Sequence, residues 1–248
     1  MHRDNTQSAE GKQFSVLLGC YGDFPHYSLR AIQSVMSEAG VGKQCDVHVG
    51  CNACSAPTLD ALRGLADGGG IQTLIESRPN LNKDPMMRLL IAVTATPYLL
   101  WMDDDSYFKP GWLKAFQCFV EENTPFDVAG AIHCSWRWPE YDAFVRRRPW
   151  WRDESRIPPD QTDKIVFPVG GMFVARTEFL RENNFPDRGM VKRVDDVLLG
   201  DLVNQAGARM IGFSHEAHHH IVINDGERRG GGEGDDGWRE VENRVSTL

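Results

Sequence analysis

The sequence predicts an α/β fold, in which one mostly parallel central sheet is flanked by helices. Short apolar segments of strand character alternate with helical segments along the first half of the chain, an order typical of parallel strands joined through helices. Glycine and proline separate the segments, where turns and helix ends need them. Three consecutive carboxylates at 103–105 directly follow a strand, and ligands bind at such strand ends.

The first half reads as four strands and three helices. Pro25 suits the start of the first helix, and Gly40 suits its end. The glycines at 68–70 close the second helix, and the third stops before Pro97 because the residue preceding a proline disfavours the helical conformation. The expected strands are 14–19, 46–50, 71–76 and 98–102, and the expected helices are 25–39, 57–66 and 86–95.

The second half is less regular, because a stretch rich in tryptophan and arginine interrupts it. We expect helices at 111–123, 177–183 and 197–206, and strands at 126–132, 166–176 and 209–213. The stretch 133–164 holds Trp136, Trp138, Trp150 and Trp151, together with Arg137, Arg146, Arg147, Arg148, Arg152 and Arg156. Indole faces stack on flat rings, and guanidinium groups bind anions. The alternative is that the tryptophans pack the core and the arginines pair with the surplus acids.

Length and composition indicate one folded domain at 13–224. The chain has 248 residues, and 41% of them are hydrophobic, which is ordinary for a globular protein. Residues 1–12 are polar and lack the apolar core of a signal peptide, so we expect a disordered N-terminus and a cytoplasmic location, or the cytoplasm of a host. Residues 225–248 read as a flexible, Gly-rich acidic tail.

No apolar run approaches the ~20 residues that span a bilayer. The net charge of −8 argues against a broadly basic surface.

The acidic run after the strand 98–102 predicts a divalent metal. Burying adjacent like charges is costly unless a cation compensates them, and oxygen ligands suit Mg²⁺ or Mn²⁺. Alternate residues of a strand share a face, so Asp103 and Asp105 can point the same way while Asp104 points elsewhere. A solvated acidic turn is the less favoured interpretation, since a turn does not need three carboxylates.

The six cysteines are expected to be reduced thiols in a cytoplasmic protein. Cys45, His48, Cys51 and Cys54 have spacings that a zinc site can use. We favour a strand over a zinc site there, because structural zinc sites usually join two Cys-x-x-Cys knuckles across a longer gap.

Four motifs, in this order and spacing, resemble those of GT-A-fold glycosyltransferases of the family-2 type. They are the opening strand Phe14–Tyr21, the acidic run 103–105 followed by Lys109-Pro110-Gly111-Trp112-Leu113, the glycine motif Gly170–Arg176, and the acidic pair opening Asp195-Asp196-Val197-Leu198-Leu199-Gly200. The resemblance covers about residues 13–213. It implies a donor half at about 13–110 and an acceptor half at about 111–224.

The resemblance implies a transferase that moves a sugar, with a hexose expected, from a nucleotide-sugar to a hydroxyl acceptor. A UDP-sugar is the expected donor, and Mn²⁺ or Mg²⁺ the expected metal. The implied donor contacts are Cys20, Tyr21, Asp103 and Asp104; the implied metal ligands are Asp105, Asp103 and a C-terminal histidine, with His218 and His220 preferred because they would share a face in an extended segment.

The acidic pair is expected to carry the catalysis. In inverting members of the family the second acid is the general base, which corresponds to Asp196, and Asp195 would orient the acceptor. The alternative is that the two aspartates only cap the helix, but capping does not need two aspartates. The family pair usually begins with Glu, so the choice of base between Asp195 and Asp196 stays open, with a lean to inversion.

The acceptor is expected to contact the glycine motif and the Trp/Arg stretch. The expected contacts are Gly170, Gly171, Trp136, Trp150 and Arg147. A carbohydrate or glycolipid fits these residue types, and so does a hydroxymethylated base in DNA, as used by some phage enzymes. The absence of a membrane segment disfavours a lipid.

Two other classes of protein remain as alternatives. Sugar nucleotidyltransferases carry a basic Gly-rich loop after the first strand, but residues 19–23 contain no basic residue. A non-catalytic sugar-binding relative would not need the acids Asp103, Asp105 and Asp196. Neither the donor sugar nor the oligomeric state follows from the sequence.

Overall fold

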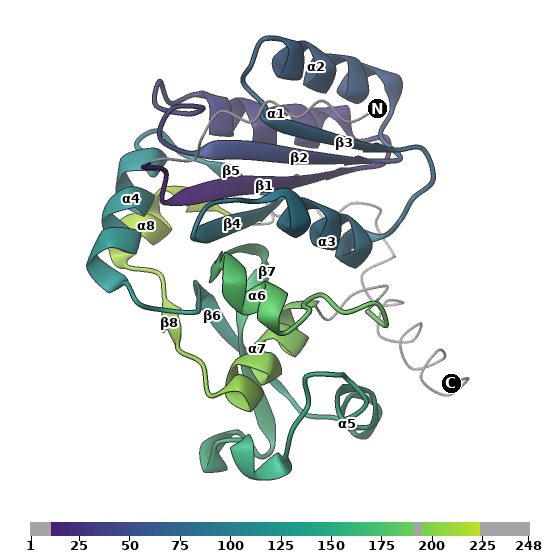
Figure 1. Ribbon diagram of the computed structural model, residues 1–248, viewed down its shortest axis with the longest axis vertical. Helices are drawn as coiled ribbons and strands as arrows, with labels where there is room; N and C mark the ends of the chain where they lie inside the picture. The colour runs from purple at the N-terminus through teal and green to yellow at the C-terminus, as the bar shows by residue number, and fades with distance from the viewer. Residues whose placement is uncertain (1–10, 191–194, 224–248) are drawn as a thin grey trace.

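A seven-stranded sheet forms the centre of the computed structural model, which describes residues 11–190 and 195–223 (Figure 1). The strand order is β3-β2-β1-β4-β7-β6-β8, and β7 runs antiparallel to both of its neighbours while the others are parallel. The strands are β1 Phe14–Tyr21, β2 Asp46–Asn52, β3 Thr73–Ser77, β4 Tyr98–Asp103, β6 Val128–Trp136, β7 Lys164–Arg176 and β8 Met210–Gly212. The mostly parallel sheet is therefore confirmed.

Helices cover both faces of the sheet, and each face has its own apolar core. One core joins β1 and β2 to the helices α1 (Pro25–Met36), α2 (Ala56–Asp67), α4 (Trp112–Asn123) and α8 (His215–His219). The other core joins β4 and β7 to α3 (Lys83–Val93), α5 (Pro139–Val145), α6 (Thr177–Glu182) and α7 (Asp195–Ala206). Neighbouring residues of β1 point into different cores, Leu17 into one and Leu18 into the other, which is why its sequence is apolar throughout.

One glycine fixes how closely α7 lies on β7. A Cβ atom at Gly200 would collide with the carbonyl oxygen of Val166 and lie 2.8 Å from Cβ of Phe167. Only a residue without a side chain fits there, so α7 lies directly against the strand. This contact places the first turn of α7 at the edge of the sheet where β4 ends (Figure 1).

Several elements differ from the expected ones, because pairing with distant strands determines the conformation of short segments. The strand expected to end at residue 132 continues to Trp136, where it pairs with Lys164 of β7. Two short strands, β5 (Tyr107–Phe108) and β9 (Ile221–Val222), pair antiparallel, and α5 lies within the Trp/Arg stretch. The expected N-terminal and C-terminal disordered segments lie outside the described residues, except for 11 and 12. No helix in the described ranges is both long enough and apolar enough to span a bilayer.

Candidate active site

The acidic turn, the acidic pair and the glycine motif come together at the edge of the sheet where β1, β2 and β4 end. Met102 at the end of β4 pairs with Met172 of β7, so the glycine motif on β7 runs alongside the acidic turn. The helices α3 and α7 both begin at this edge. Side chains from four separate segments can therefore meet there.

Asp103 and Asp104 point to opposite faces, as the strand periodicity predicts. Asp103 accepts hydrogen bonds from the Trp101 indole N–H at 2.9 Å and from Lys83 Nζ at 2.9 Å. Asp104 is fully buried and accepts from the Ser28 hydroxyl at 2.5 Å and the Tyr21 backbone N–H at 3.2 Å. The Asp104 carboxylate thus holds the loop after β1 in place. Its expected contact with a donor stays a prediction.

Asp105 has a carboxylate oxygen that is left unpaired within the described part of the chain. Its Oδ1 atom is buried and has no hydrogen-bond partner among residues 11–190 and 195–223. Burial, together with the negative charge of Asp103, raises the pKa of the Asp105 carboxyl to about 6. A nearby cation would relieve both effects.

Lys83 joins the two acidic segments, and the sequence analysis missed it. Its Nζ atom lies 2.9 Å from Asp103 Oδ2 and 3.0 Å from Asp195 Oδ2, and it donates to the Gly170 carbonyl at 3.0 Å. Burial disfavours the charged ammonium, but Asp103 and Asp195 outweigh that effect and raise the pKa of Lys83. The one sequence signal was a lysine at a helix start, where the helix dipole disfavours a positive charge.

Asp195 and Asp196 lie in the first turn of α7, beside the glycine motif. Asp195 is buried against Lys83, whereas Asp196 is partly exposed. Asp196 accepts hydrogen bonds from the backbone N–H groups of Gly170 at 3.2 Å and Val197 at 2.9 Å. Burial and the neighbouring Asp195 raise the pKa of the Asp196 carboxyl to about 6, against the opposing effect of Lys83. A partly exposed carboxylate with a pKa near neutrality suits a general base.

We expect Gly170→Ala to lower kcat by about tenfold through displacement of Asp196, because small displacements of a catalytic group are costly. A Cβ atom at residue 170 would lie 3.0 Å from Cβ and 3.1 Å from Oδ2 of Asp196. Gly64→Ala on α2, where a Cβ would meet nothing within 4 Å, is the matched control. Steady-state kinetics with thermal unfolding of both variants checks this. Equal kcat in the two variants would contradict the prediction.

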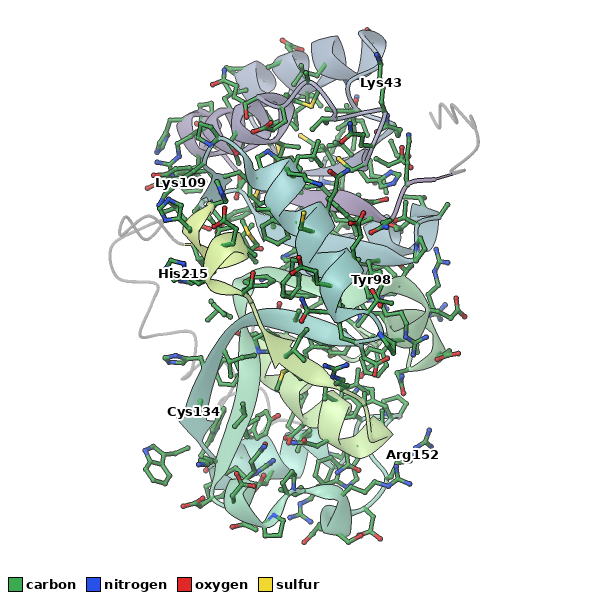
Figure 2. The ribbon with its side chains drawn as sticks, turned by 90° about the vertical axis from the view of Figure 1, so that its left-hand side faces the viewer. Lys43, Tyr98, Lys109, Cys134, Arg152 and His215 are labelled. Atoms are coloured by element: carbon green, nitrogen blue, oxygen red, sulfur yellow. The ribbon has the colours of Figure 1, made fainter. Side chains whose placement is uncertain are left out.

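The expected metal site with a histidine is not assembled. Residues 215–219 are helical rather than extended, so His218 and His220 do not share a strand face. The pairing of β5 with β9 sets His220 beside Lys109, whose N–H donates to the His220 carbonyl at 2.8 Å, and the imidazole bonds Glu216 at 3.2 Å. Figure 2 shows Lys109 and His215 on the same side of the molecule. Among the described residues, no three His, Cys, Asp or Glu side chains are grouped to hold a metal ion.

The expected acceptor residues separate into three groups. Gly170 and Gly171 lie at the site. Trp150 is 3% exposed within the core, so its ring does not reach an acceptor, and that expectation is wrong. Trp136 is 72% exposed at the end of β6, opposite Lys164, about 20 Å along β7 from Gly170 at roughly 3.3 Å per residue.

Two further expected contacts differ in exposure. Arg147 is exposed, and its guanidinium donates to the Ala143 carbonyl at 3.0 Å. The Cys20 side chain lies in the core, which leaves only its backbone to contact a donor, whereas Tyr21 is partly exposed. Of the residues expected to contact donor or acceptor, Tyr21 and the two glycines therefore lie near the acidic turn.

Comparison with known proteins identifies a family and a fold. The profile described as "Glycosyl transferase family 2" matches residues 15–183. Among solved structures, S. aureus TarS 1–349 has a TM-score of 0.61 at 13% identity over 95% of this chain and 64% of that chain, and its complex with UDP has a TM-score of 0.60 at 14% identity. Mannosyltransferase PcManGT from Pyrobaculum calidifontis, in complex with GDP-Man and Mn²⁺, has a TM-score of 0.55 at 14% identity over 84% of this chain and 56% of that chain. The chain thus spans less than two thirds of these proteins, and no curated protein matches it.

Proposed function

We propose that this chain, which belongs to glycosyl transferase family 2, transfers a hexose from a nucleotide-sugar donor to a hydroxyl group of an acceptor. The main support for the proposal is that one ammonium group, that of Lys83, links two acidic segments of the chain. Lys83 bonds both Asp103, after β4, and Asp195, at the start of α7. A UDP-sugar is the favoured donor, since TarS of the same fold has been crystallised with UDP and with UDP-GlcNAc.

Asp105 and Asp103 fit a Mn²⁺ or Mg²⁺ ion. Such ions are usually held by one or two carboxylates together with substrate phosphates, and Asp105 offers a buried oxygen that no described residue bonds. When bound, the ion would stabilise negative charge on the leaving diphosphate. PcManGT, of the same fold, was crystallised with Mn²⁺. His218 and His220 are not in the proposed ligand set, because His218 lies in α8 and His220 caps its end, so the two side chains do not share a strand face.

Asp196 is the proposed general base of a single, inverting displacement. The acceptor oxygen forms a bond to the anomeric carbon while the bond from that carbon to the diphosphate breaks. The hydroxyl proton passes to Asp196, whose orientation is fixed by the Gly170 N–H. Asp195 positions Lys83 rather than the acceptor, which differs from the expected role of Asp195.

A donor panel tests the proposal directly. The protein is incubated with UDP-, GDP- and TDP-sugars and Mn²⁺, with and without simple glycan acceptors, and the products are read by mass spectrometry. Release of a nucleoside diphosphate from one donor class, faster with an acceptor, supports the transferase. Formation of a nucleotide-sugar from a sugar phosphate and a nucleoside triphosphate would show a nucleotidyltransferase instead.

Lys83→Met is expected to move the pH profile of kcat upward. The base works only when deprotonated, so activity should rise with pH through the Asp196 pKa of about 6. Lys83 lowers that pKa, and removing its charge should therefore shift the midpoint to higher pH. Lys83→Arg keeps the charge and should keep the midpoint near the wild-type value. An unshifted profile in Lys83→Met would refute the electrostatic link between Lys83 and Asp196.

Trp136 is proposed to contact the distal part of an extended carbohydrate acceptor. Because it lies far along β7 from Gly170, it does not contact the reacting sugar. We expect Trp136→Ala to raise KM for a long glycan by about 5–30-fold, as for a lost stacking contact of ~1–2 kcal/mol, and to leave KM for a monosaccharide acceptor unchanged. Leu89→Ala, which removes another exposed apolar side chain (42% exposed), is the control. Equal effects on long and short acceptors would place Trp136 outside the acceptor path.

A further inference from the structure

Cys51 and Cys54 form a Cys-x-x-Cys pair between the end of β2 and the start of α2. The turn that joins them is tight, because Ala53 adopts a left-handed conformation with φ 55°. The Ala53 N–H donates to the Ser77 carbonyl at 2.8 Å, and the Ser55 N–H donates to the Gly22 carbonyl at 3.1 Å. The turn places the side chains of Cys51 and Cys54 next to each other.

The two thiols differ in access and in acidity. Cys51 is 2% exposed, whereas Cys54 is partly exposed. The hydrogen bonds from Cys54 lower the pKa of the Cys51 thiol, although burial opposes them, and the same pairing raises the pKa of Cys54. The buried Cys51 is thus the thiol that ionises more readily, and the partly exposed Cys54 is the one that a small molecule can reach.

Asn52, between the two cysteines, connects this turn to the candidate active site. Its side-chain carbonyl accepts from the Leu81 N–H at 2.7 Å, and its amide group donates to Asn80 Oδ1 at 3.0 Å and to the Asn82 carbonyl at 3.2 Å. These bonds hold the 80–82 turn that immediately precedes Lys83. A change in the turn 51–54 therefore reaches the segment that presents the ammonium group.

We propose that Cys51 and Cys54 are a redox-active dithiol, which reacts with small-molecule disulfides to close an intramolecular disulfide and thereby loosens the 80–82 turn. The Cys54 thiol passes its proton to the Cys51 thiolate and attacks one sulfur of oxidised glutathione, which expels one glutathione thiolate and leaves a mixed disulfide. The Cys51 thiol gives that proton to the expelled thiolate, attacks the Cys54 sulfur and expels the second glutathione thiolate, which takes a proton from solvent. The two cysteines lose two electrons, and the small disulfide is reduced to two thiols.

Closing the bond requires movement of the turn. The sulfurs must approach from hydrogen-bond contact to about 2.05 Å, and the Cβ–S–S–Cβ angle must become roughly perpendicular. Asn52 lies inside the closed loop, so its bonds to residues 80–82 are strained or broken. The inference does not depend on the proposed transfer reaction.

The test equilibrates the full chain with glutathione buffers of increasing oxidised fraction, alkylates the remaining thiols and maps the peptides by mass spectrometry. We expect a Cys51–Cys54 peptide lighter by two hydrogen atoms, and none from Cys54→Ser. Cys118→Ser, which removes another partly exposed thiol, should behave as wild type. Full alkylation of Cys51 and Cys54 in the most oxidising buffer, or a Cys20–Cys51 disulfide across the neighbouring strands, would overturn the proposal.

Hydrogen exchange tests the connection to the active site. The Leu81 amide is bonded to Asn52, so oxidation should accelerate its exchange several-fold in wild type and in Cys118→Ser but not in Cys54→Ser. A closed disulfide with unchanged Leu81 exchange would refute the loosening of the 80–82 turn.

Discussion

Replacing Asp196 with asparagine is expected to lower kcat by about 10²–10⁴, because a positioned general base contributes that much to the rate. Asparagine has nearly the same shape and still offers an oxygen to the Gly170 N–H, but it does not take up the acceptor proton. Donor affinity should stay at the wild-type value. Steady-state turnover and calorimetric titration with UDP and Mn²⁺ measure the two quantities separately.

Stability distinguishes this result from misfolding. Above about pH 6 the Asp196 carboxylate is charged, and its burial and the neighbouring Asp195 oppose that charge. Neutral asparagine removes both costs, so the melting temperature at pH 7–8 should stay equal or rise. Asp195→Asn is the comparison, because it removes an ion pair with Lys83. An active Asp196→Asn beside an inactive, donor-binding Asp195→Asn would assign the base to Asp195.

Replacing Asp105 with alanine is expected to remove the metal-dependent part of UDP binding and to lower kcat by about 10²-fold or more, since a metal at a leaving group contributes several kcal/mol. The reason is the buried Oδ1 atom of Asp105, which has no hydrogen-bond partner in the described part of the chain and whose negative charge a cation would balance. UDP is titrated with Mn²⁺ and with a chelator, for wild type and variant.

Asp160→Ala, which removes an exposed carboxylate remote from β4, is the control and should bind as wild type. If Asp105→Ala retains the increase in UDP affinity that Mn²⁺ gives the wild type, Asp105 is not a ligand. If Mn²⁺ does not change the UDP affinity of the wild type, the positive charge at the donor site would come from Lys83 instead of a metal ion.

The sequence predicts best those features that one strand or one helix determines. The apolar run before Asp103 predicted β4, and strand periodicity predicted that Asp104 would point away from Asp103. The glycine motif and the acidic pair were also found, and the structure adds that Gly170 is small because Asp196 packs against it.

Features that depend on contacts between distant segments were not predicted. Lys83 is the first residue of α3, and only the packing of α3 and α7 on the same edge shows that it forms ion pairs with Asp103 and Asp195. Trp150 was expected to contact the acceptor, as Trp136 was, because composition does not reveal which tryptophan of the stretch faces the core. The preference for His218 and His220 held only for an extended segment, and the structure has the helix α8 there, with Ser214 accepting a hydrogen bond from the Ala217 N–H as its cap.

The antiparallel strand β7 has a consequence for how the chain is made. It supplies the second neighbour of β4, yet residues 104–163, which are 60 residues, lie between the two strands. At about 5–20 residues per second, a ribosome takes roughly 3–12 s to synthesise them. During that time Tyr98–Asp103 has β1 on one side and, on the other, an open edge of unpaired backbone N–H and C=O groups between apolar side chains. Such an edge pairs readily with other chains, so a nascent chain needs shielding until β7 emerges, and a fragment ending near residue 110 would aggregate rather than fold as an independent donor half.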